Sequence, residues 1–131
     1  MTNAMTRDQV EAFVQAWISA WNRGDVESVA AHYAEDAVFT SPRAEALTGH
    51  PVVRGRRALL AYWTSGRAKA GRFDFRLLDW SWDNEKQVLT LRYLSRRGAA
   101  EPIRAVEIMR FAGMNSIVEG EALYGAQARI S

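Results

Sequence analysis

Hydrophobic residues recur at helical spacing near the start of the chain. Six of them form one face of a predicted helix: Val10, Phe13, Val14, Trp17, Ile18 and Trp21. Thr6 and Gln9 match a capping box before this helix, and Gly24 suits a left-handed C-cap after it. Asp25 then offers the N-cap of a short second helix, whose apolar residues are Val26, Val29, Ala30 and Tyr33. The pattern predicts two helices that meet at a tight corner.

The middle of the chain is less regular. Residues 37–40 are typical of a β-strand that ends at Ser41, whereas residues 43–54 contain Gly and Pro without a clear period. We expect a loop over residues 43–54. A third helix is predicted over residues 56–69, where the inward side chains are Leu59, Leu60 and Trp63.

From residue 73 onward the hydrophobic period changes to two. Four strands are predicted, over residues 73–82, 87–95, 103–111 and 117–124, and short turn-forming segments join them as hairpins. Helices followed by antiparallel strands indicate an α+β domain in which a curved sheet wraps over the helices. We expect one domain over residues 1–131, with residues 1–5 disordered.

Composition narrows the chemistry. The chain has 131 residues, a net charge of +2 and no Cys, so His and carboxylates are the remaining groups for acid–base or metal chemistry. Scattered arginines argue against a nucleic-acid partner, and no spacing of His and carboxylates indicates a metal site. The absence of Cys, of a membrane-length apolar run and of a signal-peptide core predicts a cytoplasmic protein without a membrane partner.

One acid stands on an apolar strand side. In the predicted strand 103–111, alternation places Ile103, Ala105, Glu107, Met109 and Phe111 on the same side. A carboxyl group among hydrophobic side chains must be neutralised, paired or functional, and burial raises its pKa. Two explanations of Glu107 stay open: a structural ion pair with an arginine such as Arg92, or a polar group in a ligand pocket.

The first long strand is apolar on both sides. Strict alternation over residues 73–82 puts Trp80 and Trp82 with Leu78, opposite Phe73, Phe75 and Leu77. A sheet that is apolar on both faces suggests that one face covers the helices and the other meets a partner. The alternative is that both tryptophans cap the rim of a pocket.

Several motifs together resemble the nuclear transport factor 2-like superfamily, nearest its SnoaL-like and ketosteroid-isomerase-like branches. They are residues 21–25 (WNRGD), 33–39 (YAEDAVF), Ser41-Pro42, Gly55 with 61–63 (AYW), 106–111 (VEIMRF) and 121–124 (EALY). The resemblance implies a cone-shaped half-barrel: three N-terminal helices packed in the concave face of a curved, mainly antiparallel sheet. It also implies a deep apolar pocket at the open end and a homodimer through the outer sheet face.

The resemblance carries site residues onto this sequence. Glu107 falls on the carboxylic acid of the ketosteroid-isomerase oxyanion hole, and Trp17 falls on the phenol that binds the same oxyanion, so both are implied to be catalytic. The ligand-binding positions it suggests are Tyr33, Phe39, Ser41, His50, Trp63, Met109, Gly120, Ala122 and Tyr124. Gly120 and Ala122 would leave room for a ligand. Core packing is the alternative for the aromatic residues, and solvent exposure is the alternative for His50.

Ser41 departs from the isomerase pattern. Isomerases place a carboxylate here to move a proton between carbons, and a serine hydroxyl without an adjacent imidazole is no base near neutral pH. Ketosteroid isomerase activity is therefore not expected.

Three functions remain open. They are a cofactor-independent isomerase, cyclase, dehydratase or hydrolase acting on an apolar carbonyl compound through Glu107, a non-catalytic binding protein for a hydrophobic or aromatic ligand, and a dimeric interaction module.

Overall fold

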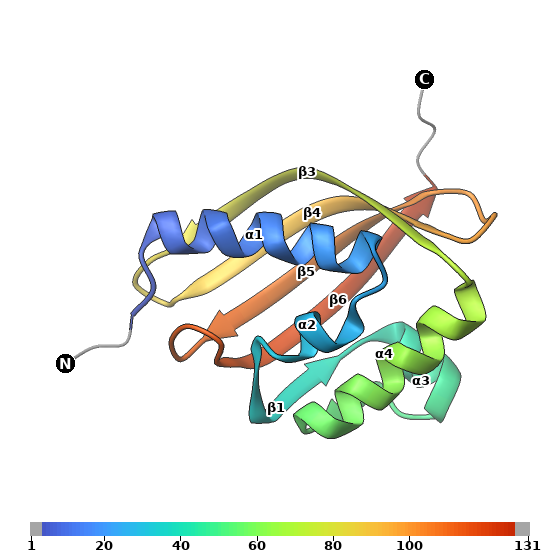
Figure 1. Ribbon diagram of the computed structural model, residues 1–131, viewed down its shortest axis with the longest axis horizontal. Coiled ribbons are helices and arrows are strands. Elements are labelled where there is room, and N and C mark those ends of the chain that lie inside the picture. Colours follow the sequence, from blue (N-terminus) through green and yellow to red (C-terminus); the bar gives the residue numbers. More distant parts are fainter. Residues whose placement is uncertain (1–3, 128–131) are drawn as a thin grey trace.

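Residues 4–127 fold into four helices against one six-stranded sheet. The structure, a computed structural model, describes residues 4–127. The helices are α1 Arg7–Asn22, α2 Val26–Ala30, α3 Pro42–Thr48 and α4 Arg56–Ala70. The strands are β1 Tyr33–Thr40, β2 Val52–Arg54, β3 Phe73–Asp83, β4 Val88–Arg97, β5 Ile103–Phe111 and β6 Ile117–Gln127. Figure 1 shows α1 lying along the sheet, with α3 and α4 gathered at one end.

The sheet is curved and mainly antiparallel. Its strand order is β2-β1-β6-β5-β4-β3, and only the β1–β6 pair is parallel. The two ends of the order, β2 and β3, do not pair, so the sheet stays open and wraps part of the way round the helices. This architecture confirms the α+β class and the expected arrangement of helices on the concave face of a curved sheet.

Local signals set the N-terminal helices. Thr6 accepts a hydrogen bond from Gln9 N while the Gln9 side chain accepts one from Thr6 N, so the predicted capping box is present. Asp25 caps α2 by accepting from Ser28 N at 3.1 Å. The α1 end is tied to the sheet, because the Asn22 amide both accepts from Phe75 N and donates to Phe75 O. This contact positions β3 over α1.

The prediction of a loop over residues 43–54 was wrong. That segment contains most of α3 and all of β2. Ser41 caps α3 through its side chain, Pro42 occupies the first turn, and Gly49 ends the helix in the left-handed region at φ 86°. Because α3 spans seven residues and buries only Ala44, it carries no hydrophobic period for a sequence to display. Tyr33, expected on the second helix, instead begins β1.

The four predicted long strands are confirmed, but β3 does not alternate strictly. Its register against β4 shifts between Leu77 and Asp79, so that Trp80 lies opposite Leu91 and Trp82 opposite Leu89. Both leucines are core residues, so the bulge turns the two tryptophans to the concave face. The expectation that they mark the outer face was therefore wrong. There Trp80 lies under the Arg7 guanidinium and Trp82 packs edge-on against Phe111.

Met5, near the start of the described residues, packs into the core. Met5 is 4% exposed, and its backbone N donates to Gln87 Oε1 at 2.7 Å. The disorder of residues 1–5 stays a prediction, and the Met5 side chain belongs to the buried core. Residues 1–3 of that prediction lie outside the described residues.

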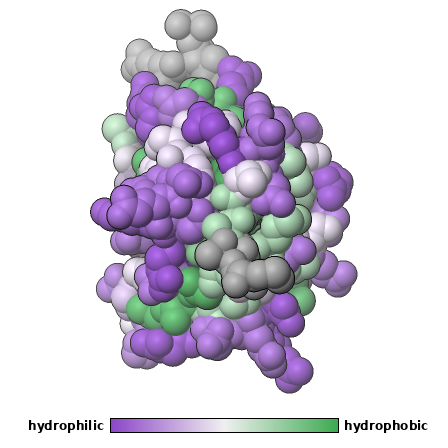
Figure 2. Space-filling model, turned by 90° about the vertical axis from the view of Figure 1, so that its left-hand side faces the viewer, coloured by the Kyte–Doolittle hydropathy of each residue, from purple (hydrophilic) through white to green (hydrophobic). Residues whose placement is uncertain are grey.

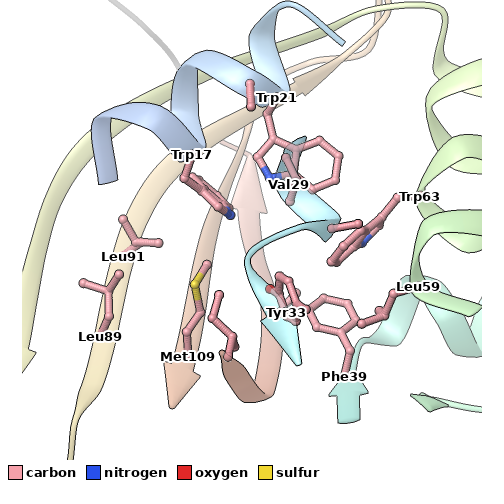
Figure 3. Close-up of a cluster of buried hydrophobic side chains, with 14 of the residues drawn as sticks. Trp17, Trp21, Val29, Tyr33, Phe39, Leu59, Trp63, Leu89, Leu91 and Met109 are labelled. Atoms are coloured by element: carbon pink, nitrogen blue, oxygen red, sulfur yellow. The ribbon is translucent and has the colours of Figure 1, made fainter. Parts of the chain in front are cut away.

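The core between helices and sheet is rich in aromatic rings. Figure 3 shows Trp17 and Trp21 from α1, Trp63 from α4, and Tyr33 and Phe39 from β1 converging on one cluster. The Trp63 ring contacts three of these neighbours edge-on, with ring centroids 5.1 Å from Tyr33, 5.4 Å from Trp21 and 5.5 Å from Phe39. Trp63 thereby fixes α4 against both α1 and β1.

The surface at the end where α1 begins can be followed in Figure 2. At the end where α1 begins, hydrophilic side chains dominate and hydrophobic residues form smaller areas between them (Figure 2). None of the helices within residues 4–127 has the length and apolar character that a membrane crossing requires.

Candidate functional site

A cavity of about 420 Å³ lies between α3, α4 and the concave face of the sheet. It occupies the end of the molecule where α3 and α4 gather, on the right in Figure 1. Aromatic side chains form much of its wall, including Trp21, Phe39, Trp63, Phe73, Phe75 and Tyr93. An apolar wall with few polar groups is the usual composition of a small-molecule site.

Glu107 is the acid in this wall. It lies in the middle of β5 with its side chain 4% exposed, between Ala105 and Met109 on the inward side of the strand. The hydroxyl of Tyr93 donates to Glu107 Oε2 at 3.0 Å. Arg92, considered as an ion-pair partner, instead pairs with Asp79 on the outer face. A structural salt bridge to Arg92 therefore does not explain Glu107.

Burial decides the protonation state of Glu107. Loss of solvation raises the pKa of its carboxyl from 4.5 to about 8, against smaller lowering effects of the Tyr93 hydrogen bond and the Arg97 charge. The carboxyl is thus mainly protonated at pH 7. Burial also raises the pKa of the Tyr93 hydroxyl well above 10, so Tyr93 stays a neutral donor. Proton exchange near neutral pH is therefore available at Glu107 and not at Tyr93.

Three other predicted site residues line the same cavity. Phe39 from β1, Trp63 from α4 and Tyr124 from β6 surround it together with Glu107. Each comes from a different element, so the cavity depends on the packing of the whole concave face. The structure thus brings four of the predicted positions together.

Trp17 lies outside the cavity lining. It is 1% exposed and packs its ring 5.3 Å from that of Tyr93, while its Nε1 has no hydrogen-bond partner among the described residues. Figure 3 shows it within the apolar cluster of α1 and the sheet. Trp17 therefore does not donate to Glu107. Tyr33, Met109 and Ala122 are likewise buried core residues that do not line the cavity.

The remaining predicted positions, Ser41, His50 and Gly120, also lie outside the cavity lining. The Ser41 hydroxyl accepts from Arg43 N at 3.2 Å as the cap of α3, and His50 is exposed beyond the end of that helix. Neither lines the cavity. Gly120 leaves no room for a ligand, because a Cβ there would lie 3.0 Å from Phe39 Cδ1 and 3.4 Å from the Tyr33 hydroxyl. The absent side chain makes space for two core rings.

Several lining residues were not predicted. The cationic ones are Arg43, Lys69 and Arg97, and Tyr93 supplies the hydrogen bond to Glu107. The inward position of Tyr93 could have been predicted from the sequence, since Tyr93 alternates with Leu91 along a predicted strand. The position of Arg43 could not have been predicted, because its helix α3 shows no hydrophobic period. Within residues 4–127 no group of three or more His, Cys, Asp or Glu side chains is placed to hold a metal ion.

The fold and site together define a class: a helix-filled, curved α+β half-barrel with an apolar cavity at one end, as in nuclear transport factor 2-like proteins. A family model for the SnoaL-like domain matches residues 14–120, so the chain belongs to the SnoaL-like family. The resemblance seen in the sequence motifs is thereby confirmed. The chain has no significant match among curated proteins.

Solved structures agree on the fold. A SnoaL-like protein of unknown function from Burkholderia thailandensis superposes with a TM-score of 0.81 at 22% identity, covering 94% of this chain and 99% of that one. A protein of unknown function with a cystatin-like fold from Methylobium petroleophilum gives a TM-score of 0.76 at 17% identity, covering 96% and 82%. The epoxide hydrolase/cyclase-like enzyme SalBIII has a role in pyran ring formation in the polyether salinomycin. It superposes with a TM-score of 0.72 at 17% identity, covering 92% of this chain and 95% of that one.

Proposed function

We propose that this protein binds a small, mainly apolar carbonyl compound in the cavity and exchanges a proton with it through Glu107. The reaction class is that of a cofactor-independent isomerase, cyclase, dehydratase or hydrolase. The observation that carries this proposal is a buried carboxyl group in the cavity wall whose pKa is raised to about 8. An acid that titrates near neutral pH within an apolar cavity is suited to donate and recover a proton.

In the proposed reaction, Glu107 both donates a proton to the ligand and takes one back. The protonated Glu107 carboxyl donates its proton to a ligand oxygen, and the resulting carboxylate, which retains the hydrogen bond from Tyr93, then takes a proton back from the ligand. The Ser41 hydroxyl is not available as a second base, because it caps α3 and does not line the cavity. This supports a reaction other than the ketosteroid isomerisation.

Filling the cavity tests the binding part. Gly66 of α4 lines the cavity, and a Cβ there meets nothing within 4 Å, so Gly66→Leu places a side chain in the cavity space. Ketones, epoxides and aromatic acids are screened by thermal shift against the unaltered protein. We expect hits whose shift is lost in Gly66→Leu and kept in Ser65→Leu, which adds the same group at an exposed α4 position. Hits that survive Gly66→Leu would place binding elsewhere.

A non-catalytic binding protein is the second candidate function. It is favoured by the presence of Glu107 as the single carboxylate among the lining residues, without a second carboxylate or imidazole. The variant Glu107→Gln separates the two functions. Under the enzyme proposal, Glu107→Gln binds a screened hit and no longer turns it over, as followed by NMR of the compound. Under the binding proposal, no turnover occurs in either protein.

We also propose a homodimer through the outer sheet face. Val106, Ile108 and Leu123 lie on this face, beside ion pairs that join Arg92 to Asp79 and Arg110 to Glu119. Val106 and Leu123 lie directly opposite each other on β5 and β6, and Leu123 is 45% exposed. A partly exposed apolar strip rimmed by charges is typical of an association surface.

A further inference from the structure

Three cationic side chains face the cavity. They are Arg43 from α3, Lys69 from the last turn of α4 and Arg97 from the end of β4. The one acidic lining residue, Glu107, is mainly protonated at pH 7 and so adds little negative charge. The cavity therefore carries a net positive charge. A low-dielectric cleft with charge of one sign concentrates ligands of the opposite sign.

These cations have no anionic partner within the described chain. Three ion pairs occur in residues 4–127, and none of them includes Arg43, Lys69 or Arg97. The Nε atoms of Arg43 and Arg97 are buried and make no hydrogen bond among those residues. A buried guanidinium donor without an acceptor is costly, because it has lost water and gained nothing in return. A ligand oxygen would supply the missing acceptor.

Aromatic rings hold the two guanidinium groups in place. Arg97 Nη2 donates to the Tyr124 hydroxyl at 3.2 Å, and its Cζ lies 4.8 Å from the centre of the Phe73 ring. Arg43 Cζ lies 4.4 Å above the Tyr124 ring. Both guanidinium groups therefore flank Tyr124 and are oriented before any anion arrives. Such preorganisation reduces the entropy that binding would otherwise cost.

The sheet register separates this cationic end from the aromatic interior. Glu107 lies opposite Leu91, and Ala105 opposite Tyr93 and Tyr124. Arg97 lies further along β4, opposite Phe73 at the edge of the sheet. A ligand that spans the cavity thus meets Glu107 toward one end and the guanidinium groups, with the rings of Phe73 and Tyr124, toward the other.

We infer that the ligand is an amphipathic carboxylate, an aromatic or other apolar molecule whose anionic group is bound by Arg43 and Arg97 beside Tyr124. This rests on the proposed ligand-binding function of the cavity and adds the chemical class of the ligand. Carboxylate is favoured because two guanidinium groups offer paired N–H donors to its two oxygens. The apolar body lies among Trp21, Trp63 and Phe75, which places the remaining functional group of the ligand toward Glu107.

Matched probes test the inference. Naphthalene-2-carboxylate, naphthalene-2-carboxamide and naphthalen-2-ylmethylammonium share one apolar body and differ in charge. Calorimetric titration at pH 6.5 is expected to give a Kd for the carboxylate at least about tenfold lower than for the carboxamide, with no binding of the ammonium. Arg97→Gln and Arg43→Gln should each raise the carboxylate Kd about fivefold or more and leave the carboxamide Kd within about twofold. Arg104→Gln, at an exposed position of β5, should change neither.

Each outcome bears on the inference. Equal affinity for carboxylate and carboxamide overturns the anionic class and leaves the proposed pocket standing. Failure of all three probes to bind the folded protein overturns both the anionic class and the proposed pocket for ligands of this size. Arg97 also contacts the aromatic wall, so circular dichroism and thermal unfolding check that variant. If Arg97→Gln does not fold, an unchanged carboxylate Kd in Arg43→Gln overturns the inference and a raised one supports it.

Discussion

Glu107 is the residue on which the interpretation of this protein depends most. Its place on an apolar strand side was visible in the sequence, and the structure adds that it contacts Tyr93, not Arg92, and faces a cavity. A buried ion pair would have explained the residue structurally. A neutral carboxyl group held by one hydrogen bond from Tyr93 has no such ion-pair explanation. Its position in the cavity wall supports a role in the chemistry of the cavity.

The raised pKa of Glu107 makes stability depend on pH. The folded state holds the proton up to about pH 8, whereas the unfolded chain releases it near 4.5. The folded protein therefore binds more protons between these values, and stability falls as the pH rises through this window. We expect a decrease in the free energy of unfolding on the order of 4 kcal/mol between pH 4.5 and pH 8.

Glu107→Gln should remove this decrease, since the amide does not titrate. Urea unfolding at several pH values measures the effect, and Glu101→Gln at an exposed position is the control that should keep it. The same pH dependence in Glu107→Gln and the unaltered protein would mean that Glu107 titrates normally.

Tyr93 adjusts the pKa of the Glu107 carboxyl. Its hydrogen bond lowers the pKa of Glu107 and opposes the effect of burial. Tyr93→Phe should therefore raise the pKa of Glu107 above about 8 and reduce stability by about 1 kcal/mol. NMR of the glutamate side-chain carbon reports the pKa directly. Tyr62→Phe, which removes a hydroxyl elsewhere in the cavity lining, should leave it unchanged.

At the scale of elements, α3 is the feature that sequence patterns missed. It supplies Arg43, Ala46 and Leu47 to the cavity wall, so the wall cannot be assembled without it. The sequence marks α3 by individual capping residues and not by a hydrophobic period. These residues are Ser41 before Pro42 at the start of the helix and Gly49 at its end. These residues also suit a turn, and only the packing of Ala44 against the rest of the molecule favours the helix.

Removing the α3 cap tests its contribution. Ser41→Ala loses the bond to Arg43 N in a fully buried site and should lower the free energy of unfolding by about 1 kcal/mol. Thermal and urea unfolding measure the loss. Ser65→Ala, on the exposed side of α4, provides a serine without a capping role. A cost at position 41 no larger than that at position 65 would show that the cap is dispensable.

For the whole molecule, the property to be tested is whether two copies associate through the outer face of the sheet. The outer face of the sheet keeps Leu123 exposed opposite Val106, while the tryptophans of β3 turn inward. If this face joins two copies, sedimentation should give a dimer. Leu123→Glu should then shift the protein to monomer, since burying a carboxylate in an apolar interface is costly. Met114→Glu, at an exposed position in the β5–β6 link, should leave the mass unchanged.

Elements with strong local signals could be predicted from the amino-acid sequence. Caps and apolar periods are properties of neighbouring residues, so α1, α2, α4 and the four long strands followed from them. The family resemblance then indicated the overall architecture, and alternation placed Glu107 on the inward side. These conclusions needed no knowledge of which distant residues meet.

Which residues line the cavity depends on the three-dimensional packing. The bulge at Leu78 reversed the sides of Trp80 and Trp82, and Trp17 and Tyr33 became core while Arg43 and Arg97 reached the cavity. Register shifts and cavity walls depend on contacts between strands and helices far apart in the chain. No local pattern encodes them, because the same aromatic side chain packs equally well against a core or a ligand.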